Sequence, residues 1–387
     1  MNLKSTLEPE TLFATLADLV SINSVNPQYP GGPGEGALAE YVSDYFAKNS
    51  IPFEFQAVTE GRSNVIAKVE GKPGDRTLIL EAHMDTASEI GMFRQPFQPL
   101  REGNRLYGRG SCDTKAGLAA MMHALKTLKR AGVCPQSTVL LLAAVDEEYS
   151  FRGVSKFVEK GIRADGAIVA EPTGLTTIVA SKGVLRWRLK THGRAAHSAK
   201  PHLGVNAVTE MAKVLMAMEE RFPVMFRDRR HALLGCPTYN VGIIRGGVQV
   251  NQVPDSCTIE IDRRLLPGET KESVWKEFEC LLSSLGEKNP ELEVEMEAPL
   301  MDENALETPA SERIVQVVSN VSQKLLGHAR MEGVPFGSDA GRLARAGIPS
   351  IILGPGCIDQ AHAAEEYVNL DQVALAAELY MESVLEF

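Results

Sequence analysis

The chain has 387 residues, a length that suits two domains and leaves room for a substantial buried core. Its 44% hydrophobic and 23% charged composition is ordinary for a globular protein, and its net charge of −10 disfavours nucleic acid or an anionic membrane as a partner. No stretch approaches the roughly 20 apolar residues of a membrane span, and the first residues show no apolar core behind a basic segment. The six cysteines are scattered without a C-x-x-C pair. We therefore expect a cytoplasmic protein with reduced thiols and no signal peptide.

Apolar runs alternate with helical segments along the first half of the chain. The expected helices lie at about 8–20, 36–49, 114–131 and 153–160. The expected strands lie at 63–71, 77–85, 137–145 and 166–171. Continuous apolar strands in β-α-β order are typical of an α/β sheet with helices on both faces.

The pattern changes after Gly174. The segments 184–192 and 257–265 alternate apolar with polar residues, as half-exposed antiparallel strands do. Helices are expected beside them at about 205–220 and 270–286. From about residue 310 the first pattern returns, with a helix, a strand at 349–356 and a last helix at 371–386. We therefore predict a discontinuous α/β domain of residues 1–177 and 296–387, with an α+β domain of residues 178–295 inserted into it.

Side chains that can bind metals stand at or just beyond the ends of the apolar strands, or just before a helix. They are His83, Asp85, Asp113, Glu147, Glu148, Glu171 and His362. In open α/β sheets, the carboxyl edge of the strands is where ligands bind. The three consecutive acids at 146–148 would repel one another unless they face water or a cation lies among them. Imidazoles and carboxylates without thiolates suit zinc, with cobalt or manganese as alternatives.

Five ordered motifs give the chain a family resemblance. They are H-M-D at 83–85, G-R-G-x-x-D-x-K-x-G at 108–117, D-E-E at 146–148, A-E-P-T at 170–173 and A-H at 361–362. Over nearly its whole length the chain resembles the M20 metallo-aminoacylases and peptidases, which include acetylornithine deacetylase, succinyl-diaminopimelate desuccinylase, aminoacylase-1 and carboxypeptidase G2. The resemblance implies a di-metal catalytic domain with a mixed sheet, and an inserted ferredoxin-like lid through which two chains form a homodimer.

The resemblance also implies a ligand set. His83, Asp113 and Glu171 would hold one metal, while Asp113, Glu148 and His362 would hold the second. Asp113 would bridge the two ions. The expected cofactor is thus a pair of divalent metal ions per subunit.

Two further roles follow from the resemblance. Glu147 would be the general base, taking a proton from the attacking water and passing it to the leaving amine. Successive side chains diverge in an extended segment, so Glu147 and Glu148 are not expected to meet one metal in the same way. Asp85 would not be a ligand but could hydrogen-bond the far nitrogen of His83. The peptide bond between residues 113 and 114 would be cis.

Substrate-binding residues are expected in the inserted domain and after it. The resemblance makes His197 the donor to the oxyanion, acting from the partner subunit. It places Asn251 and Arg264 where relatives bind the carbonyl and the carboxylate of the substrate. Gly337 and Ser338, in a glycine-rich segment, could line the pocket through backbone N–H groups, although turn formation alone would also explain the glycines.

The motifs favour hydrolysis of the amide bond of a short N-acyl-L-amino acid, in amino-acid biosynthesis. The acetylornithine deacetylases are the best match, while desuccinylation and a carboxypeptidase or dipeptidase activity remain open, as does a non-catalytic binding role. An ornithine ammonium would require an acid, for which Asp339 and Asp359 are candidates.

Overall fold

The computed structural model describes residues 7–74 and 76–387 and divides into two compact units. The first unit comprises Met1–Val179, Glu307–Glu332 and Ser338–Phe387, and the second comprises Ala180–Leu306 and Gly333–Gly337. The second unit extends beyond residue 295 because strand β13 (Met301–Glu303) pairs with its strand β9 (Gly183–His192).

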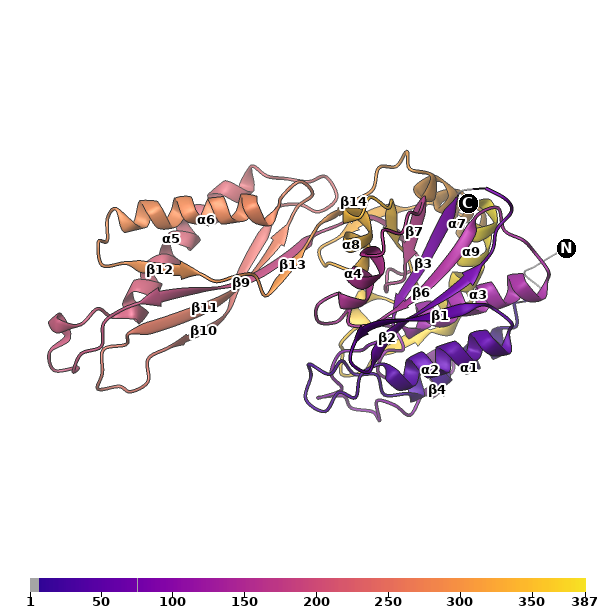
Figure 1. Ribbon diagram of the computed structural model, residues 1–387, viewed down its shortest axis with the longest axis horizontal. Helices are drawn as coiled ribbons and strands as arrows, with labels where there is room; N and C mark the ends of the chain where they lie inside the picture. The colour runs from indigo at the N-terminus through magenta and orange to yellow at the C-terminus, as the bar shows by residue number, and fades with distance from the viewer. Residues whose placement is uncertain (1–6, 75) are drawn as a thin grey trace. The chain divides into compact units, whose positions relative to one another are not determined.

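The first unit is built on a nine-stranded mixed sheet (Figure 1). Its order is β1-β2-β6-β3-β7-β16-β8-β14, with β15 paired to β8. The strands are β1 (Phe53–Thr59), β2 (Arg62–Val69), β3 (Thr77–His83), β6 (Thr138–Ala144), β7 (Gly166–Val169), β8 (Thr177–Ser181), β14 (Leu306–Glu307), β15 (Met331–Val334) and β16 (Ser350–Ile352). Strands β6, β3, β7 and β16 run parallel, so their carboxyl ends meet at one edge of the sheet. A small separate sheet has the order β17-β5-β4, with β17 (Tyr367–Asn369), β5 (Arg105–Tyr107) and β4 (Leu100–Glu102).

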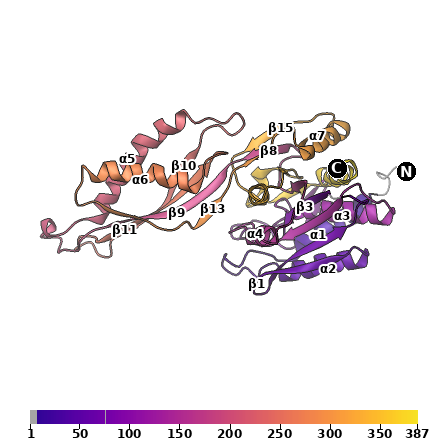
Figure 2. The same cartoon turned by 45° about the horizontal axis from the view of Figure 1, so that its top comes forward.

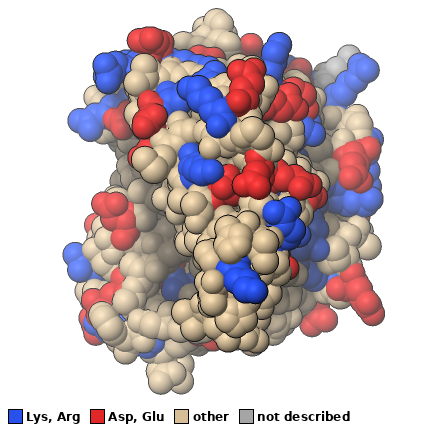
Figure 3. Space-filling view, turned by 90° about the vertical axis from the view of Figure 1, so that its left-hand side faces the viewer, with Lys and Arg blue, Asp and Glu red and all other residues tan. Residues whose placement is uncertain are grey.

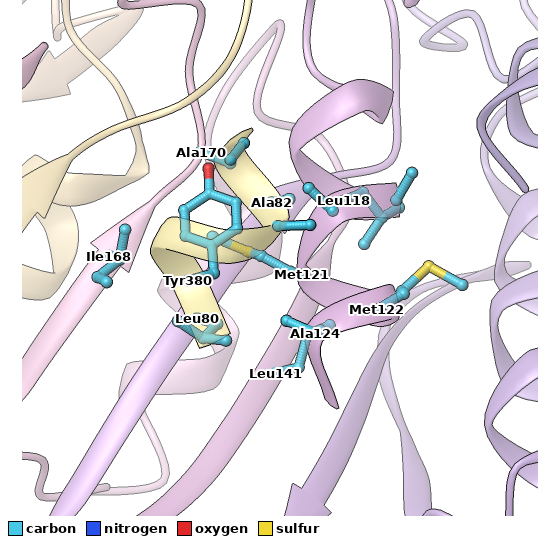
Figure 4. Close-up of a cluster of buried hydrophobic side chains, with 14 of the residues drawn as sticks. Leu80, Ala82, Leu118, Met121, Met122, Ala124, Leu141, Ile168, Ala170 and Tyr380 are labelled. Carbon is cyan, nitrogen blue, oxygen red and sulfur yellow. The ribbon is translucent and has the colours of Figure 1, made fainter. Parts of the chain in front are cut away.

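Helices cover both faces of the large sheet. One layer contains α1 (Pro9–Ser21), α2 (Gly36–Lys48), α3 (Lys115–Arg130), α7 (Arg313–Leu326) and α9 (Leu370–Glu386). The other contains α4 (Arg152–Val158) and α8 (Asp339–Arg345). In the core, Met121 of α3 and Tyr380 of α9 lie among Leu80 and Ala82 of β3 (Figure 4). The buried Tyr380 hydroxyl donates to the carbonyl of Leu353 at 2.6 Å, which satisfies both polar groups and ties α9 to the end of β16.

The second unit packs two helices on one face of an antiparallel sheet (Figure 2). Its strand order is β10-β11-β9-β12, and its other elements are β10 (Thr238–Gly246), β11 (Ser256–Leu265), β12 (Glu293–Met296), α5 (Ala207–Arg227) and α6 (Lys271–Gly286). Burial alternates along β11, which leaves Arg263 buried against Phe226 and Arg264 on the opposite face. Trp187 and Phe278 form the centre of the core with Phe222. The structure also has 3₁₀ turns at Pro201–Leu203 (η2) and Ile358–Gln360 (η3).

The predicted α/β architecture is confirmed, and each predicted helix and strand has a counterpart. The helix expected at 205–220 continues to Arg227, through Pro223. The strand expected at 349–356 ends at Ile352, because the G-P-G that follows cannot continue a strand. The strands that were not predicted are β1, β4, β5, β8, β10, β12, β13, β14, β15 and β17. Most residues of β10 are exposed and a register shift interrupts it, so its sequence lacks a regular alternation.

The structure gives two observations that concern nucleic acid and membranes, the partners that the net charge disfavoured. Among the residues that the structure describes, no helix is both long and apolar enough to cross a membrane. On the face shown in Figure 3, basic and acidic side chains are intermixed with uncharged surface, so that face presents no field of a single sign.

Candidate metal centre

The parallel strands bring the predicted metal-binding side chains to one edge of the sheet. His83 is the last residue of β3, Glu147 and Glu148 follow β6, Glu171 follows β7, and His362 lies in the connection between β16 and β17. Asp113 precedes α3, which packs against β3 and β6. All of these side chains belong to the first unit.

Potential ligand atoms gather in two groups. His83, Glu147 and Glu171 form one, and Asp113, Glu148 and His362 form the other. Within each group the ligand atoms lie within 4.8 Å of one another. The second group is the predicted second metal site. In the first group, Glu147 occupies the place that the resemblance gave to Asp113. These distances alone therefore do not show whether Glu147 is a metal ligand or the general base.

Asp113 nevertheless faces both groups. Its Oδ1 atom lies 3.1 Å from Nε2 of His83, and its Oδ2 atom lies 3.4 Å from Nε2 of His362. Each carboxylate oxygen is therefore directed at a different imidazole. A carboxylate in this position can bind one ion with each oxygen.

Main-chain and side-chain groups orient the other members of the second group. Glu148 approaches Nε2 of His362 with both oxygens, at 3.1 and 3.0 Å. Its Oε1 atom also accepts a hydrogen bond from the amide of Ala87 at 2.9 Å. Ala87, in the loop after β3, thus fixes the carboxylate of Glu148, which follows β6.

Asp85 supports the centre in a different way from the one predicted. Nδ1 of His83 donates to the main-chain carbonyl of Asp85 at 2.9 Å, whereas the nearest carboxylate oxygen of Asp85 is 3.7 Å away. This bond places a proton on Nδ1 and directs Nε2 towards the other ligands. The carboxylate of Asp85 instead accepts from the amides of Glu147 at 3.0 Å and Glu148 at 3.1 Å.

A buried polar network behind Asp85 was not predicted from the sequence. The side-chain amide of Asn26 donates to Asp85 at 2.7 Å and to Asp146 at 2.9 Å. Asp146 also pairs with Arg62 at 3.0 Å, and Arg62 binds Glu35 through two hydrogen bonds. The first acid of the D-E-E segment is therefore neutralised inside the protein, away from the two ligand groups.

The amino-terminal end of α3 approaches β7 closely. The hydroxyl of Thr114 donates to the carbonyl of Ala170 at 2.8 Å. A Cβ atom at Gly117 would lie 2.5 Å from that of Ala170, so glycine permits this approach. The peptide bond between Asp113 and Thr114 is cis, which confirms the prediction. The close contact brings Asp113 beside the segment that carries Glu171.

The electrostatics of the site fit a pair of divalent cations. Burial and the charge of Glu171 raise the pKa of Glu147 well above its usual range, and burial and the charge of Asp113 do the same for Glu171. Hydrogen bonds with Asp113 and Glu148 raise the pKa of His362 to about 10. A bound cation would stabilise the charged form of these carboxylates, and the oxygen and imidazole donors suit zinc, cobalt or manganese.

Four of the predicted substrate-binding residues belong to the second unit. His197 is exposed, and its Nδ1 atom accepts from the amide of Ala199 at 3.1 Å. Asn251 is exposed near it, and its main-chain carbonyl accepts from the amide of Ser198 at 3.1 Å.

Arg264 binds Asp262, two residues before it, at 2.8 Å, so its guanidinium already has one carboxylate partner. Gly337, the fourth, lies against Val184: a Cβ atom at this glycine would be 3.3 Å from that side chain. Ser338, in the first unit, is the N-cap residue of α8.

The two acids considered for an ornithine ammonium differ in exposure. Asp339 is only 1% exposed, and burial raises its pKa to about 6. Asp359 is exposed in η3.

Comparisons with known proteins identify relatives of the whole chain. An acetylornithine deacetylase of Myxococcus xanthus is 28% identical over 381 residues, covering 97% of each chain. A probable succinyl-diaminopimelate desuccinylase of Staphylococcus aureus (strain N315) is 25% identical over 415 residues, covering 99% of each.

Solved structures share the fold at lower identity. The aminopeptidase PepT of Bacillus cereus matches with a TM-score of 0.79 at 22% identity, covering 98% of each chain. The YXEP protein of Bacillus subtilis, a dinuclear metal-binding peptidase of the M20 family, matches with a TM-score of 0.74 at 14% identity, covering 97% of each. The pattern that defines Peptidase family M20/M25/M40 matches residues 79–386. Because this match covers most of the chain, the protein belongs to the M20/M25/M40 family of hydrolases.

Proposed function

We propose that the protein is a di-metal amidohydrolase that removes a short acyl group from an α-amino acid. The position of Asp113 carries this proposal, because its two oxygens face the imidazoles of two separate ligand groups. When bound, a pair of zinc ions would polarise the amide carbonyl and lower the pKa of the attacking water. His83, Asp113 and Glu171 would hold one ion, and Asp113, Glu148 and His362 the other.

Glu147 is the proposed general base. It would take a proton from the water as the carbonyl is attacked, then deliver that proton to the nitrogen of the leaving amine. The two neighbouring glutamates differ in their contacts, which supports this division of roles. Glu148 is held by the amide of Ala87 and by His362, whereas Glu147 belongs to the first group, with its Oε2 atom 3.9 Å from Nε2 of His83. Asp85 would position both through their main-chain amides.

His197 is the proposed donor to the oxyanion of the tetrahedral intermediate. In a neutral imidazole whose Nδ1 accepts a hydrogen bond, the proton resides on Nε2. The exposed edge of the ring would therefore be a donor, as this role requires. We place His197 in the active site of a partner subunit, as the family resemblance implies.

A homodimer through the second unit is supported by its exposed edge. Strand β10 is at the end of its sheet, and an unpaired strand edge is a template for pairing with another chain. Ile244 in β10 is 55% exposed, and Val248 just after it is 87% exposed. Burying this apolar surface against a second copy would stabilise a dimer.

An N-acetylated, cationic amino acid such as N-acetylornithine is the proposed substrate. The acetylornithine deacetylase of Myxococcus xanthus supports the choice, although the desuccinylase of similar identity keeps an N-succinyl substrate as the alternative. Asp359, which is exposed, is the acid that we propose for the ammonium group. Its charge would attract a side-chain ammonium and repel the free carboxylate of a succinyl group.

Metal content is the first test. We expect two divalent ions per chain, since each ligand group has three donors. Chelation should abolish activity, and stepwise return of zinc, cobalt or manganese should restore it. Elemental analysis and titration against activity measure both quantities, and full activity in the metal-free protein would show that the proposal is wrong.

A pair of isosteric variants separates base from ligand. Glu147→Gln should keep both ions and lose roughly 10²–10⁴-fold in kcat, the usual contribution of a general base. Glu148→Gln should weaken one ion selectively, because only two strong donors remain in its group. Calorimetric metal titration of each variant reports the difference. Equal metal affinities in the two variants would contradict the assigned roles.

Substrate choice can be tested with matched pairs. N-acetyl-L-ornithine should give a higher kcat/KM than N-succinyl-diaminopimelate or dipeptides. Asp359→Asn should lower kcat/KM for N-acetyl-L-ornithine by up to about fivefold, the size of an exposed ion pair. N-acetyl-L-norvaline, which lacks the ammonium, is the control and should be unaffected. A preference for succinylated substrates or dipeptides would favour the alternative activities.

Subunit exchange tests the placement of His197. His197→Ala should lower kcat by roughly 10²–10³-fold, with little change in KM or metal content, because an oxyanion donor acts mainly in the transition state. In a mixed dimer with Glu147→Gln, one site carries both changes and the other carries neither. Random exchange of equal amounts should therefore restore about a quarter of the unaltered activity. Verified exchange without any recovery would show that His197 does not act across the dimer.

A further inference from the structure

We propose that Glu366 is a positioning residue that holds the bridging ligand Asp113 in place for both metal ions. This inference rests on the proposed function, in which Asp113 is shared between two ions. The carboxylate of Glu366 is completely buried and accepts four hydrogen bonds from the segment 109–113. It is neither a member of the ligand groups nor one of the predicted catalytic residues.

The four bonds are divided between the two oxygens. Oε1 accepts from the amides of Cys112 at 2.9 Å and Asp113 at 3.1 Å. Oε2 accepts from the guanidinium of Arg109 at 2.7 Å and the amide of Gly110 at 3.0 Å. The main-chain amide of Asp113 therefore donates to the charged carboxylate of Glu366. Charge-assisted hydrogen bonds of this kind are stronger than neutral ones.

The segment 109–113 has no regular structure that could satisfy these amides. Gly110 has a φ of 81°, a left-handed conformation, and the segment lies between β5 and α3. Buried amides that lose their acceptor are costly, so the chain would shift to find other partners. Such a shift would move Asp113 relative to both His83 and His362.

Glu366 also links this segment to the second imidazole. It follows His362 by four residues, and its main-chain carbonyl accepts from the amide of Gly108 at 3.1 Å. Immediately after it, β17 pairs with β5, which precedes the Asp113 segment. The segment 362–366 therefore carries both His362, a ligand of the second ion, and Glu366, which supports the shared ligand Asp113.

Replacement by glutamine tests the role with little change in shape. An amide has one acceptor oxygen, so Glu366→Gln leaves two of the four donors facing an NH₂ group. We expect the affinity for both ions to fall by roughly 10–100-fold, the usual effect of removing a residue that orients metal ligands. Competition titration of the metal-free protein with Zn²⁺ and a chromophoric chelator measures each dissociation constant. The visible spectrum of the Co²⁺-loaded protein should also change.

Glu365→Gln is the matched control. Glu365 is adjacent and also pairs with an arginine, Arg94, but at the surface. Its replacement should leave both dissociation constants within twofold of the unaltered protein. If Glu366→Gln does not fold, Glu366→Asp provides a second test, because it keeps the charge but is too short to reach all four donors. Weakened binding of both ions in this variant supports the proposal equally.

Two results would overturn the inference, and they are distinguishable. If Glu366→Gln melts at a lower temperature without metal yet binds both ions as tightly as the unaltered protein, Glu366 supports the fold alone. The same conclusion follows if Glu366→Asp binds both ions normally. If the unaltered protein binds no divalent ion, the proposed function itself is wrong, and the inference with it.

Discussion

The structure depends on how it accommodates a concentration of negative charge at one buried edge of a sheet. Carboxylates in this position lose hydration and repel one another unless donors or cations surround them. The protein separates the acids into two kinds. Those with dedicated N–H or guanidinium partners, such as Asp85, Asp146 and Glu366, are compensated within the fold. In the two ligand groups, burial and the charges of neighbouring carboxylates raise the pKa values of Glu147 and Glu171. The acids of the second kind gather with the two histidines, where a metal could bind them.

The parallel arrangement of β6, β3, β7 and β16 determines which acids can meet. Because these strands share a direction, their carboxyl ends deliver side chains from four distant parts of the sequence to one edge. The core beneath them provides rigidity. Leu80 and Ala82 of β3 are wholly buried under α3 and α9, and Tyr380 ties α9 to the end of β16. A site built on such strands holds its ligands more accurately than one built on loops alone.

Much of this could be predicted from the sequence, and the failures have physical causes. Continuous apolar strands that end in acids or histidine revealed the metal-binding residues, because strand direction alone places those ends together. Asn26 and Glu366 were missed, since their roles depend on partners 59 or more residues away and their sequence surroundings carry no periodic signal. The role of Asp85 was predicted only in part. A sequence shows that an acid is near His83, but not whether its carboxylate or its carbonyl makes the hydrogen bond.

The geometry at Asp113 implies that the two halves of the centre are not independent. One oxygen faces His83 and the other faces His362, so any rotation of this carboxylate that improves one contact changes the other. The groups that hold its main chain must therefore satisfy two sites at once. Four donors on one buried glutamate, and a helix that approaches β7 closely enough to require glycine, are constraints of that kind. A loop held by fewer bonds could serve one ion, but a shared ligand requires an orientation that neither ion alone determines. Because both ions would use Asp113, a change in its orientation at one site would alter the affinity of the other, which couples the two affinities through a single side chain.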